Sequence, residues 1–326
     1  MIGLIVARII NHRRDSYRKA ERQRLVPMLL EADFDPLLPN ASKPSSALLA
    51  NLAIELIQMV RGSDKETFVA KAFQLGVPLT LRHRLEHGSP RVRLAAAEAL
   101  ADFGDPSSLE QLHATLDDRN ADVRLAAALA LAAVGDAPPV RDLIEKLGLG
   151  SKETSMLVVS LFQDIAANRP HEIKALISDP KTNIAVKVSA IDALSASADY
   201  SIVPLIADLV LKAEPGAEEI PRYLRALGAF AHPAGSDAVE HALASTSWWV
   251  RSAAAEAAGK IGMSAASSRL AALLDDPEWW VRFRAGEALT RLGPAGQHLL
   301  SDVAREGSQT ARIAARLTLA EHGIPA

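Results

Sequence analysis

The chain has 326 residues, of which 49% are hydrophobic but only 4% are aromatic, so its core must be built mainly from alanine and leucine. It contains no cysteine, which excludes thiol catalysis and thiolate metal sites. The net charge of −3 excludes a general electrostatic attraction to nucleic acid.

The first 31 residues combine an apolar start with a basic continuation. Residues 1–10 read MIGLIVARII, and residues 1–31 carry seven Lys/Arg against three acidic residues. A membrane-spanning helix needs roughly twenty apolar residues, so this stretch is too short to cross a bilayer. Three interpretations stay open: a peripheral helix on an anionic membrane surface, the remainder of a signal anchor, or an ordinary helix that docks on another helix.

Residues 32–47, ADFDPLLPNASKPSSA, form a predicted linker, because three prolines each disfavour helix and Ser and Asn fill the gaps between them. Helices are expected over residues 48–61, 64–76 and 77–87. We predict that residues 48–88 are an irregular cap on an array of repeats that extends over 48–326.

A repeated unit of about 31 residues governs the chain from residue 89 onward. Its clearest copies are SPRVRLAAAEALADFG at 89–104, SWWVRSAAAEAAGKIG at 247–262 and DPEWWVRFRAGEALTRLG at 276–293. A Val-Arg pair opens an Ala-rich helix in each copy, and a glycine twelve residues after the valine supplies the left-handed conformation that ends it. The glycines at this position are Gly104, Gly135, Gly262, Gly293 and Gly323.

The repeats are regular over residues 89–150 and 231–326 and degenerate over 151–230. Each unit predicts a first helix, a short turn and a second helix. In the copy at 276–293, Asp276 is expected to cap the second helix, with Pro277 in its first turn. The residues at the valine position are Val92, Val123, Thr154, Val186, Glu219, Val250, Val281 and Ala311.

A turn Asp, then Val-Arg, then an AAAEAL-type helix ending in Gly, resembles the HEAT family, specifically the short HEAT-like repeats also found in phycobilisome lyases. The resemblance implies an all-α fold, a right-handed α-solenoid whose Val-Arg helices line the concave side. It also implies that the turn Asp and the helix Arg bond along the stack, which pairs Asp118 with Arg124 and Asp276 with Arg282. The pattern is incomplete, since His87 and Ser245 stand at the Asp position of two other copies.

All four tryptophans form two doublets at equivalent positions of consecutive repeats. Neighbouring helices pack 8–10 Å apart, so the doublets are expected to be adjacent, with Trp279 reaching Phe283 and Trp280 reaching Arg284. Large rings beside arginine are typical of protein-binding hot spots and of base stacking, while the alternative is a structural role over the ends of Ala-rich helices. The predicted partner-binding residues are Trp248, Trp249, Arg251, Trp279, Trp280, Arg282, Phe283 and Arg284.

An acidic column accompanies the arginines six residues after the valine position, at Glu98, Asp192, Glu256 and Glu287. We interpret Glu256 and Glu287 as members of ordinary surface ion pairs, because Lys260 and Arg291 stand four residues beyond them.

The stretch HRLEH at 83–87 matches the H-x-x-E-H spelling of inverted zinc-protease helices and places His83 and His87 on one helix face beside Glu86. A zinc site needs a third ligand on another element, and no downstream acid is singled out. We therefore expect a polar helix end and no metal.

Other repeat enzymes fit the chain less well. Deoxyhypusine hydroxylases hold two irons with several His-Glu dipeptides, and here only His171–Glu172 has that order. The sequence therefore predicts a non-catalytic scaffold without a cofactor, monomeric and cytoplasmic, which binds a protein through its concave face and its C-terminal Trp and Arg residues. Residues 1–31 are candidates for contact with the inner face of a membrane. The alternative is a chromophore-lyase-like or DNA-glycosylase-like repeat protein that binds a small molecule or damaged DNA.

Overall fold

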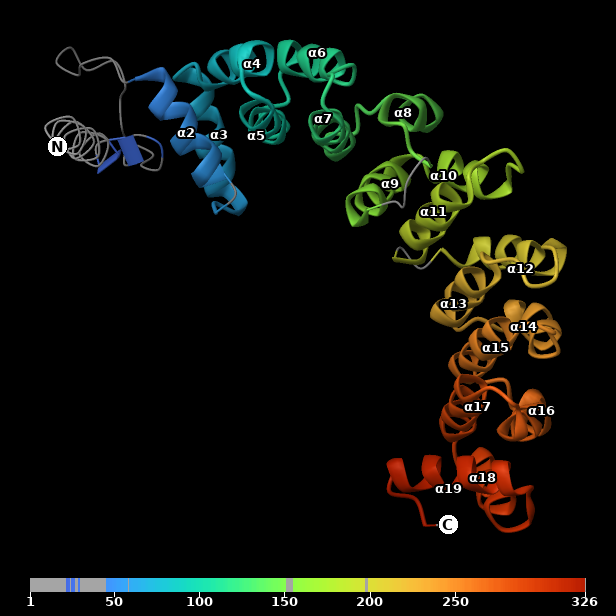
Figure 1. Ribbon diagram of the computed structural model, residues 1–326. Helices are drawn as coiled ribbons and strands as arrows, with labels where there is room; N and C mark the ends of the chain where they lie inside the picture. Colours follow the sequence, from blue (N-terminus) through green and yellow to red (C-terminus); the bar gives the residue numbers. More distant parts are fainter. Residues whose placement is uncertain are drawn as a thin grey trace, which may run out of the picture. The chain divides into compact units, whose positions relative to one another are not determined.

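The computed structural model describes residues 22–23, 25–26, 29, 45–57, 59–150, 155–196 and 199–325. The chain divides into two compact units, one ending at Gly148 and the other beginning at Leu149, and each is described by itself. Every regular element among the described residues is helical (Figure 1). The predicted all-α class is therefore confirmed.

The first unit stacks helices in pairs. Helix α4 packs on α5 and α6 on α7, while α5 packs on α7 and α4 on α6, so that two layers form. The structure confirms the predicted bounds of α4. Helices α2 and α3 each begin two residues earlier than predicted, and they also end earlier. Ser46 and Ala47 therefore belong to α2 rather than to the predicted linker. No proline follows Pro44 there to oppose the helix. The helices are α2 (Ser46–Ile57), α3 (Gly62–Gln74), α4 (Val77–His87), α5 (Pro90–Leu100), α6 (Pro106–Thr115), α7 (Ala121–Ala133) and α8 (Val140–Leu147).

Most of the predicted N-terminal segment lies outside the described residues, as do residues 32–44. Its described end packs on the helical array: Leu25 and Leu29 are fully buried, and Arg22 forms an ion pair of 2.8 Å with Glu55 of α2. This part therefore docks on another helix, which was one of the three interpretations. No helix in the part of the chain that the structure describes is long and apolar enough to cross a membrane.

The second unit continues the two-layer arrangement. The odd-numbered helices from α9 to α19 follow one another in one layer, and the even-numbered helices lie in the other (Figure 1). The helices are α9 (Met156–Asn168), α10 (Pro170–Ser178), α11 (Ile184–Ala196), α12 (Val203–Lys212), α13 (Ile220–Phe230), α14 (Ser236–Leu243), α15 (Trp248–Ile261), α16 (Ser267–Ala272), α17 (Trp279–Arg291), α18 (Pro294–Glu306) and α19 (Gln309–Glu321).

Small side chains set the spacing of the odd-numbered layer. Helices α15 and α17 approach so closely that a Cβ placed on Gly259 would lie 2.7 Å from the Cα of Ala288. Alanines fill the same interface, among them Ala254 and Ala285, which are fully buried. The interior is therefore close-packed by alanine, as the low aromatic content predicted.

The repeat signature explains where the second helix of each pair ends. The five glycines predicted to adopt the left-handed conformation all have positive φ, between 60° at Gly104 and 80° at Gly135 and Gly262. A side chain would be strained at such a φ, which is why glycine occupies the position. The predicted positive φ is therefore present at each of these turns, but Gly293, with a ψ of −152°, lies outside the left-handed helical region.

The start of α17 differs from the prediction. The helix begins at Trp279 and Glu278 is its N-cap residue, so Asp276 lies in the preceding turn and does not cap the helix. The carboxylate of Asp276 accepts a bond from the N–H of Glu278 and two bonds from Arg251 of the previous repeat. Because these three donors occupy its oxygens, Asp276 holds the turn instead of the helix end.

Candidate protein-binding surface

Two buried arginine–aspartate pairs join consecutive repeats. Arg93 donates from Nε and Nη2 to the carboxylate of Asp118 at 2.7 and 2.8 Å, and Arg251 donates in the same way to Asp276 at 2.7 and 2.9 Å. In each pair the aspartate stands in the turn before the next Val-Arg helix. The bidentate geometry fixes the helix of one repeat to the turn of the following one.

The pairing predicted from the family resemblance occurs through a different atom. Arg124 and Arg282 each donate to the backbone carbonyl oxygen of their own repeat's aspartate, at 2.8 and 2.7 Å, while the carboxylate binds the preceding arginine. Both predicted contacts are therefore present, but they lie within one repeat. The bonds along the stack join each aspartate to the arginine of the preceding repeat instead. A carbonyl carries no net charge, so Arg282 keeps its full positive charge.

The electrostatics of the first pair follow from its burial. Burial alone would raise the pKa of the Asp118 carboxyl, but the hydrogen bonds from Arg93 and from the N–H of Asn120 outweigh that effect and lower it. The same contact raises the pKa of Arg93. Both groups are thus held in their charged forms.

The tryptophan doublets occupy the first two positions of α15 and α17, where the chain turns from one layer to the other. All four rings are partly exposed, from 37% at Trp248 to 50% at Trp280. Within each doublet the rings meet edge to face, and Trp279 stacks on Phe283 with ring centroids 5.2 Å apart. The predicted contact between Trp279 and Phe283 is confirmed.

The two doublets do not meet ring to ring among the described residues. Their helices pack directly, and Ser252 Oγ lies 3.5 Å from the carbonyl oxygen of Trp280. Arg284 lies over the ring of Phe283, 5.8 Å from its centroid, and 3.6 Å from the carboxylate of Glu256, rather than on Trp280. We refer to the predicted residues as the Trp/Arg surface: Trp248, Trp249, Arg251, Trp279, Trp280, Arg282, Phe283 and Arg284.

A groove of about 290 Å³ adjoins this surface between α17 and α19, and we refer to it as the α17/α19 groove. Ile313 and Leu317 are large apolar residues of α19 that are 63% and 53% exposed. These two residues are not among those that the sequence pattern predicts for the site. One signal was present, since Leu317 stands six residues after Ala311, where the acidic column has a carboxylate. The groove is lined by Trp279, Arg282, Phe283, Thr310, Ile313, Ala314, Leu317 and Thr318.

A second groove of about 460 Å³ lies between the ends of α12 and α14 and the loop that precedes α13. The ion pair between Arg269 and Glu240, 2.8 Å long, stands on its edge. Gly216 in this loop lies against Ser247 and Trp249, so the second groove reaches the Trp/Arg surface from its other side. Two grooves thus flank the aromatic residues.

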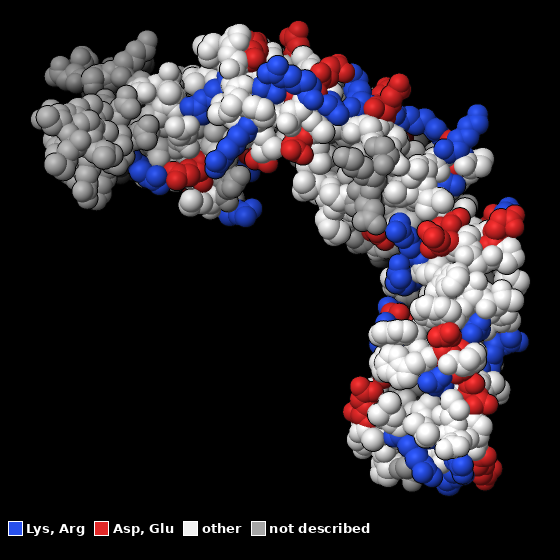
Figure 2. Space-filling model, viewed as in Figure 1, with Lys and Arg blue, Asp and Glu red and all other residues white. Residues whose placement is uncertain are grey.

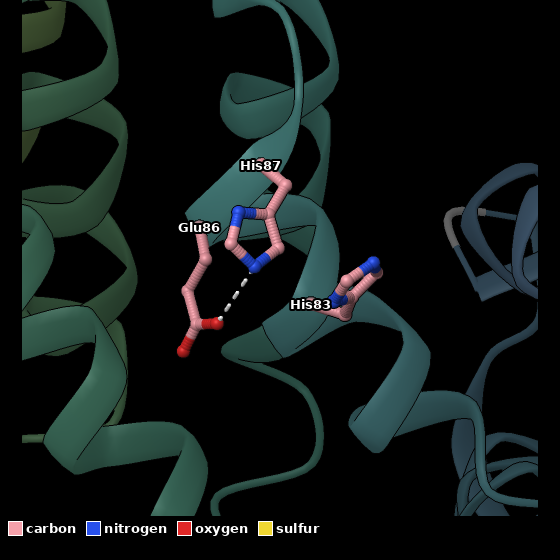
Figure 3. Close-up of side chains that lie close together, drawn as sticks. All are labelled: His83, Glu86 and His87. Carbon is pink, nitrogen blue, oxygen red and sulfur yellow. Dashed lines mark ion pairs between the residues drawn. The ribbon is translucent and has the colours of Figure 1, made fainter.

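His83, Glu86 and His87 share one turn of α4 (Figure 3). Their ligand atoms lie within 4.8 Å of one another, the rings of the two histidines are 4.7 Å apart, and Glu86 lies 3.5 Å from Nε2 of His87. All three side chains are exposed, and no further His, Asp or Glu in the described residues joins the group. The three groups could hold an ion only at the surface of one helix, where it would link no second element.

The carboxyls whose pKa is raised do not lie at either groove. Burial raises the pKa of Asp164 and of Asp192, the latter against the opposing charges of Arg225 and Arg222. Neither aspartate lines the α17/α19 groove or the second groove. Acidic and basic side chains are interspersed with uncharged surface on the face of the second unit shown in Figure 2. The α17/α19 groove therefore offers aromatic, aliphatic and arginine contacts, while the second groove is lined mainly by small and aliphatic residues together with Glu240, His241 and Arg269.

Comparison with known proteins identifies the repeats. Residues 78–153 and 222–290 match the family model of HEAT repeats. None of the curated proteins compared with the chain matches it in sequence. HEAT repeats are thus present in both of these segments, while the finer resemblance to phycobilisome lyases stays a prediction.

Solved structures of helical solenoids resemble the chain in fold. The karyopherin Kap121p bound to the extreme C-terminus of the protein phosphatase Cdc14p has a TM-score of 0.50 and 14% identity, over 87% of this chain and 38% of the karyopherin. Importin beta has a TM-score of 0.47 and 14% identity, over 97% of this chain and 53% of importin beta. Human deoxyhypusine hydroxylase in complex with glycerol has a TM-score of 0.32 and 19% identity, over 85% of this chain and 98% of the hydroxylase. This chain therefore spans less than half of the matched karyopherin.

Proposed function

We propose that this chain of HEAT repeats is a non-catalytic scaffold that binds a protein partner through the Trp/Arg surface and the α17/α19 groove. The observation that carries the proposal is the stacked pair of Trp279 and Phe283, which forms one wall of the groove while Trp279 stays 46% exposed. An indole that only filled space between helices would be covered by its neighbours. Exposed aromatic rings beside arginine are typical of interface hot spots.

The arginines of this surface differ in what they offer a partner. Arg251 is bonded to Asp276 and to two turn carbonyls, so its part is to hold the turn on which Trp279 and Trp280 stand. Arg282 bonds only to carbonyl oxygens, and its charge is available to a partner's carboxylate. Rigid support beneath partly exposed anchors lowers the entropy cost of binding.

In one of the matched structures the karyopherin Kap121p is bound to the extreme C-terminus of the protein phosphatase Cdc14p. That likeness is one of fold, so the argument for a protein partner here depends on this chain's own surface. The extended concave side of a solenoid offers the additional area that a stable interface requires.

A capture experiment with matched variants tests the proposal. The test variant is Trp279→Ala/Trp280→Ala, and the control is Met156→Ala/Leu157→Ala, which removes two exposed apolar side chains from α9 of the same unit. We expect a protein that binds the wild-type chain and the control but is lost from the tryptophan variant, with all three giving the same circular dichroism spectrum. Equal capture by both variants would contradict the assignment of the surface.

The basic N-terminal segment is a second, separable candidate for contact. Residues 1–31 carry an excess of four positive charges, and anionic lipid attracts such a segment electrostatically. We infer that vesicles containing phosphatidylserine bind the full chain more than a variant lacking residues 1–21, and that about 0.5 M salt weakens this binding. Equal binding with and without the segment would refute it.

A further inference from the structure

We infer that the α17/α19 groove takes a short amphipathic helix of a partner protein, with large apolar side chains on one face and acidic side chains beside them. This inference rests on the proposed function, because the groove shares Trp279, Arg282 and Phe283 with the Trp/Arg surface. It adds the chemical class of the partner segment. The apolar walls, their spacing and the surrounding charge each contribute to the assignment.

Two pairs of side chains form apolar rails along the groove. Trp279 and Phe283 stand four residues apart on α17, and Ile313 and Leu317 stand four residues apart on α19. Residues at this spacing share one helix face, so each rail follows its helix axis. Both helices pack against each other in one layer. A channel between two such rails matches the i, i+4 anchors of an amphipathic helix.

The size of the groove excludes a bulky ligand. A volume of about 290 Å³ lies at the lower end of the roughly 300–1,000 Å³ that small-molecule sites occupy. The groove is also shallow, since Ile313 and Leu317 remain more than half exposed. A few side chains of a partner fill this space better than a buried cofactor would.

Arg282 lines the groove, and Arg312 and Arg316 directly precede Ile313 and Leu317 on α19. Arg282 bonds to the carbonyls of Asp276 and Pro277, and Arg316 to the carbonyl of Ala304. Arg312 is exposed on α19, and no acidic group in the described part of the chain lies within ion-pair distance of it.

The acids near these arginines form no ion pair with them in the described residues. Glu287 of α17 is bonded to His322 at 2.6 Å, Asp275 accepts from the hydroxyl of Ser308 at the start of α19, and Glu278 is the N-cap residue of α17. In Figure 2 both basic and acidic side chains lie over the C-terminal helices. Complementary charge therefore favours a segment with carboxylates on either side of its apolar face.

Nucleic acid is the competing class, because arginine and aromatic rings also bind bases and phosphates. The aliphatic rail of Ile313 and Leu317 offers no ring for base stacking, and residues 32–326 carry an excess of seven negative charges that would repel a longer strand. The observations therefore favour a peptide. A single-stranded oligonucleotide therefore serves as the competing probe in the experiment that tests this inference.

The test measures fluorescence anisotropy of labelled probes with the full chain. One peptide of about eighteen residues carries Leu and Phe at i, i+4 positions flanked by Glu, and a second has every Glu replaced by Lys; a single-stranded oligonucleotide of the same charge is the third probe. We expect the Glu peptide to bind at least tenfold more tightly than the other two. Equal affinity of the two peptides, or tighter binding of the oligonucleotide, would overturn the inference.

Two variants locate the binding. Leu317→Glu places in α19 the acid that equivalent positions of other repeats carry, so the exposed site tolerates it, and we expect the Glu peptide to bind about tenfold more weakly. Arg312→Gln/Arg316→Gln is expected to weaken it severalfold and to flatten its salt dependence. Met156→Glu in α9 is the control and should leave affinity unchanged. If neither groove variant differs from the control, the peptide does not bind in the groove and the inference fails.

Failure here is distinguishable from failure of the scaffold function. A protein captured by the wild-type chain and lost from Trp279→Ala/Trp280→Ala, together with no preference for the Glu peptide, would overturn only the inference about the partner segment. Capture that is insensitive to both tryptophans would overturn the proposed function itself.

Discussion

Replacing Asp118 by alanine is expected to loosen the contact between two consecutive repeats. The carboxylate of Asp118 accepts two bonds from Arg93 and one from the N–H of Asn120, and only 5% of the Arg93 side chain is exposed. After the change the guanidinium keeps its bond of 2.8 Å to the carbonyl of Gly88 but has no counter-charge. An unpaired charge then remains in a site with little access to water.

The magnitude follows from this burial. Removing one partner of a buried ion pair costs roughly 3–5 kcal/mol, while an exposed pair is worth roughly 0–1 kcal/mol. The Asp118 side chain is 13% exposed, so some water reaches the site and the lower end applies. We expect Asp118→Ala to lower the free energy of opening helices α5 and α7 by about 3 kcal/mol. The double variant Arg93→Met/Asp118→Leu should recover most of that loss, because both charges are removed together.

Hydrogen exchange followed by mass spectrometry measures this local free energy, since neighbouring repeats can open separately. The matched control is Asp208→Ala, which removes one partner of the exposed pair with Lys212, whose side chains are 52% and 74% exposed. We expect the control to change the protection of α12 by no more than about 0.5 kcal/mol. Equal losses in Asp118→Ala and Asp208→Ala would refute the reasoning that burial decides the value of the pair.

Three further predictions concern the packing of α15 on α17, the charge of Asp118 and the two histidines of α4. Gly259→Ala should lower the melting temperature measured by circular dichroism, because the new Cβ would meet Ala288 at 2.7 Å; an unchanged melt would show that the two helices can separate freely. The pKa of Asp118 is lower in the folded chain than in the unfolded chain, so the charged carboxylate stabilises the fold at pH values above about 4, the pKa of an unfolded carboxyl. This contribution is lost as the pH falls. The difference in unfolding free energy between the wild-type chain and Asp118→Asn, measured by urea titration, should therefore become smaller from pH 6 to pH 3. A chelator should leave the melting temperature unchanged, because His83 and His87 lie on one helix turn and an ion there would crosslink nothing; a drop would indicate a structural metal.

Most of the fold could be predicted from the sequence, because the same helix-pair pattern recurs along the chain. The period of about 31 residues, the Ala-rich face and the helix-ending glycines all predict stacked helix pairs, and each of these glycines has a positive φ at which a side chain would be strained. The bounds of α4 were predicted to the residue. The start of α17 was not, since the sequence does not reveal that the carboxylate of Asp276 is already occupied by Arg251.

The register of the arginine–aspartate pairs shows what periodicity leaves open. Asp118 lies six residues before Arg124 of its own repeat and twenty-five after Arg93 of the previous one. The two offsets together make one repeat, so an array with either pairing has the same sequence pattern. Only the direction of the carboxylate, toward the preceding helix, distinguishes them.

The candidate site was predicted in part for a similar reason. Aromatic residues at i, i+4 spacing predicted the contact between Trp279 and Phe283. Ile313 and Leu317 were not singled out, because an aliphatic residue in a repeat helix is usually buried and the sequence does not show its exposed fraction. The contact between Arg284 and Glu256 joins two repeats, and spacing within one helix could not predict it.

The most direct test of the central claim is a hydrogen-exchange footprint of the full chain with and without the protein that it captures. The account predicts slower exchange in the first turns of α17 and along α19 upon binding, with the Trp279→Ala/Trp280→Ala variant showing no slowing at equal partner concentration. Protection confined to α2 to α8, or the same footprint in the tryptophan variant, would contradict it.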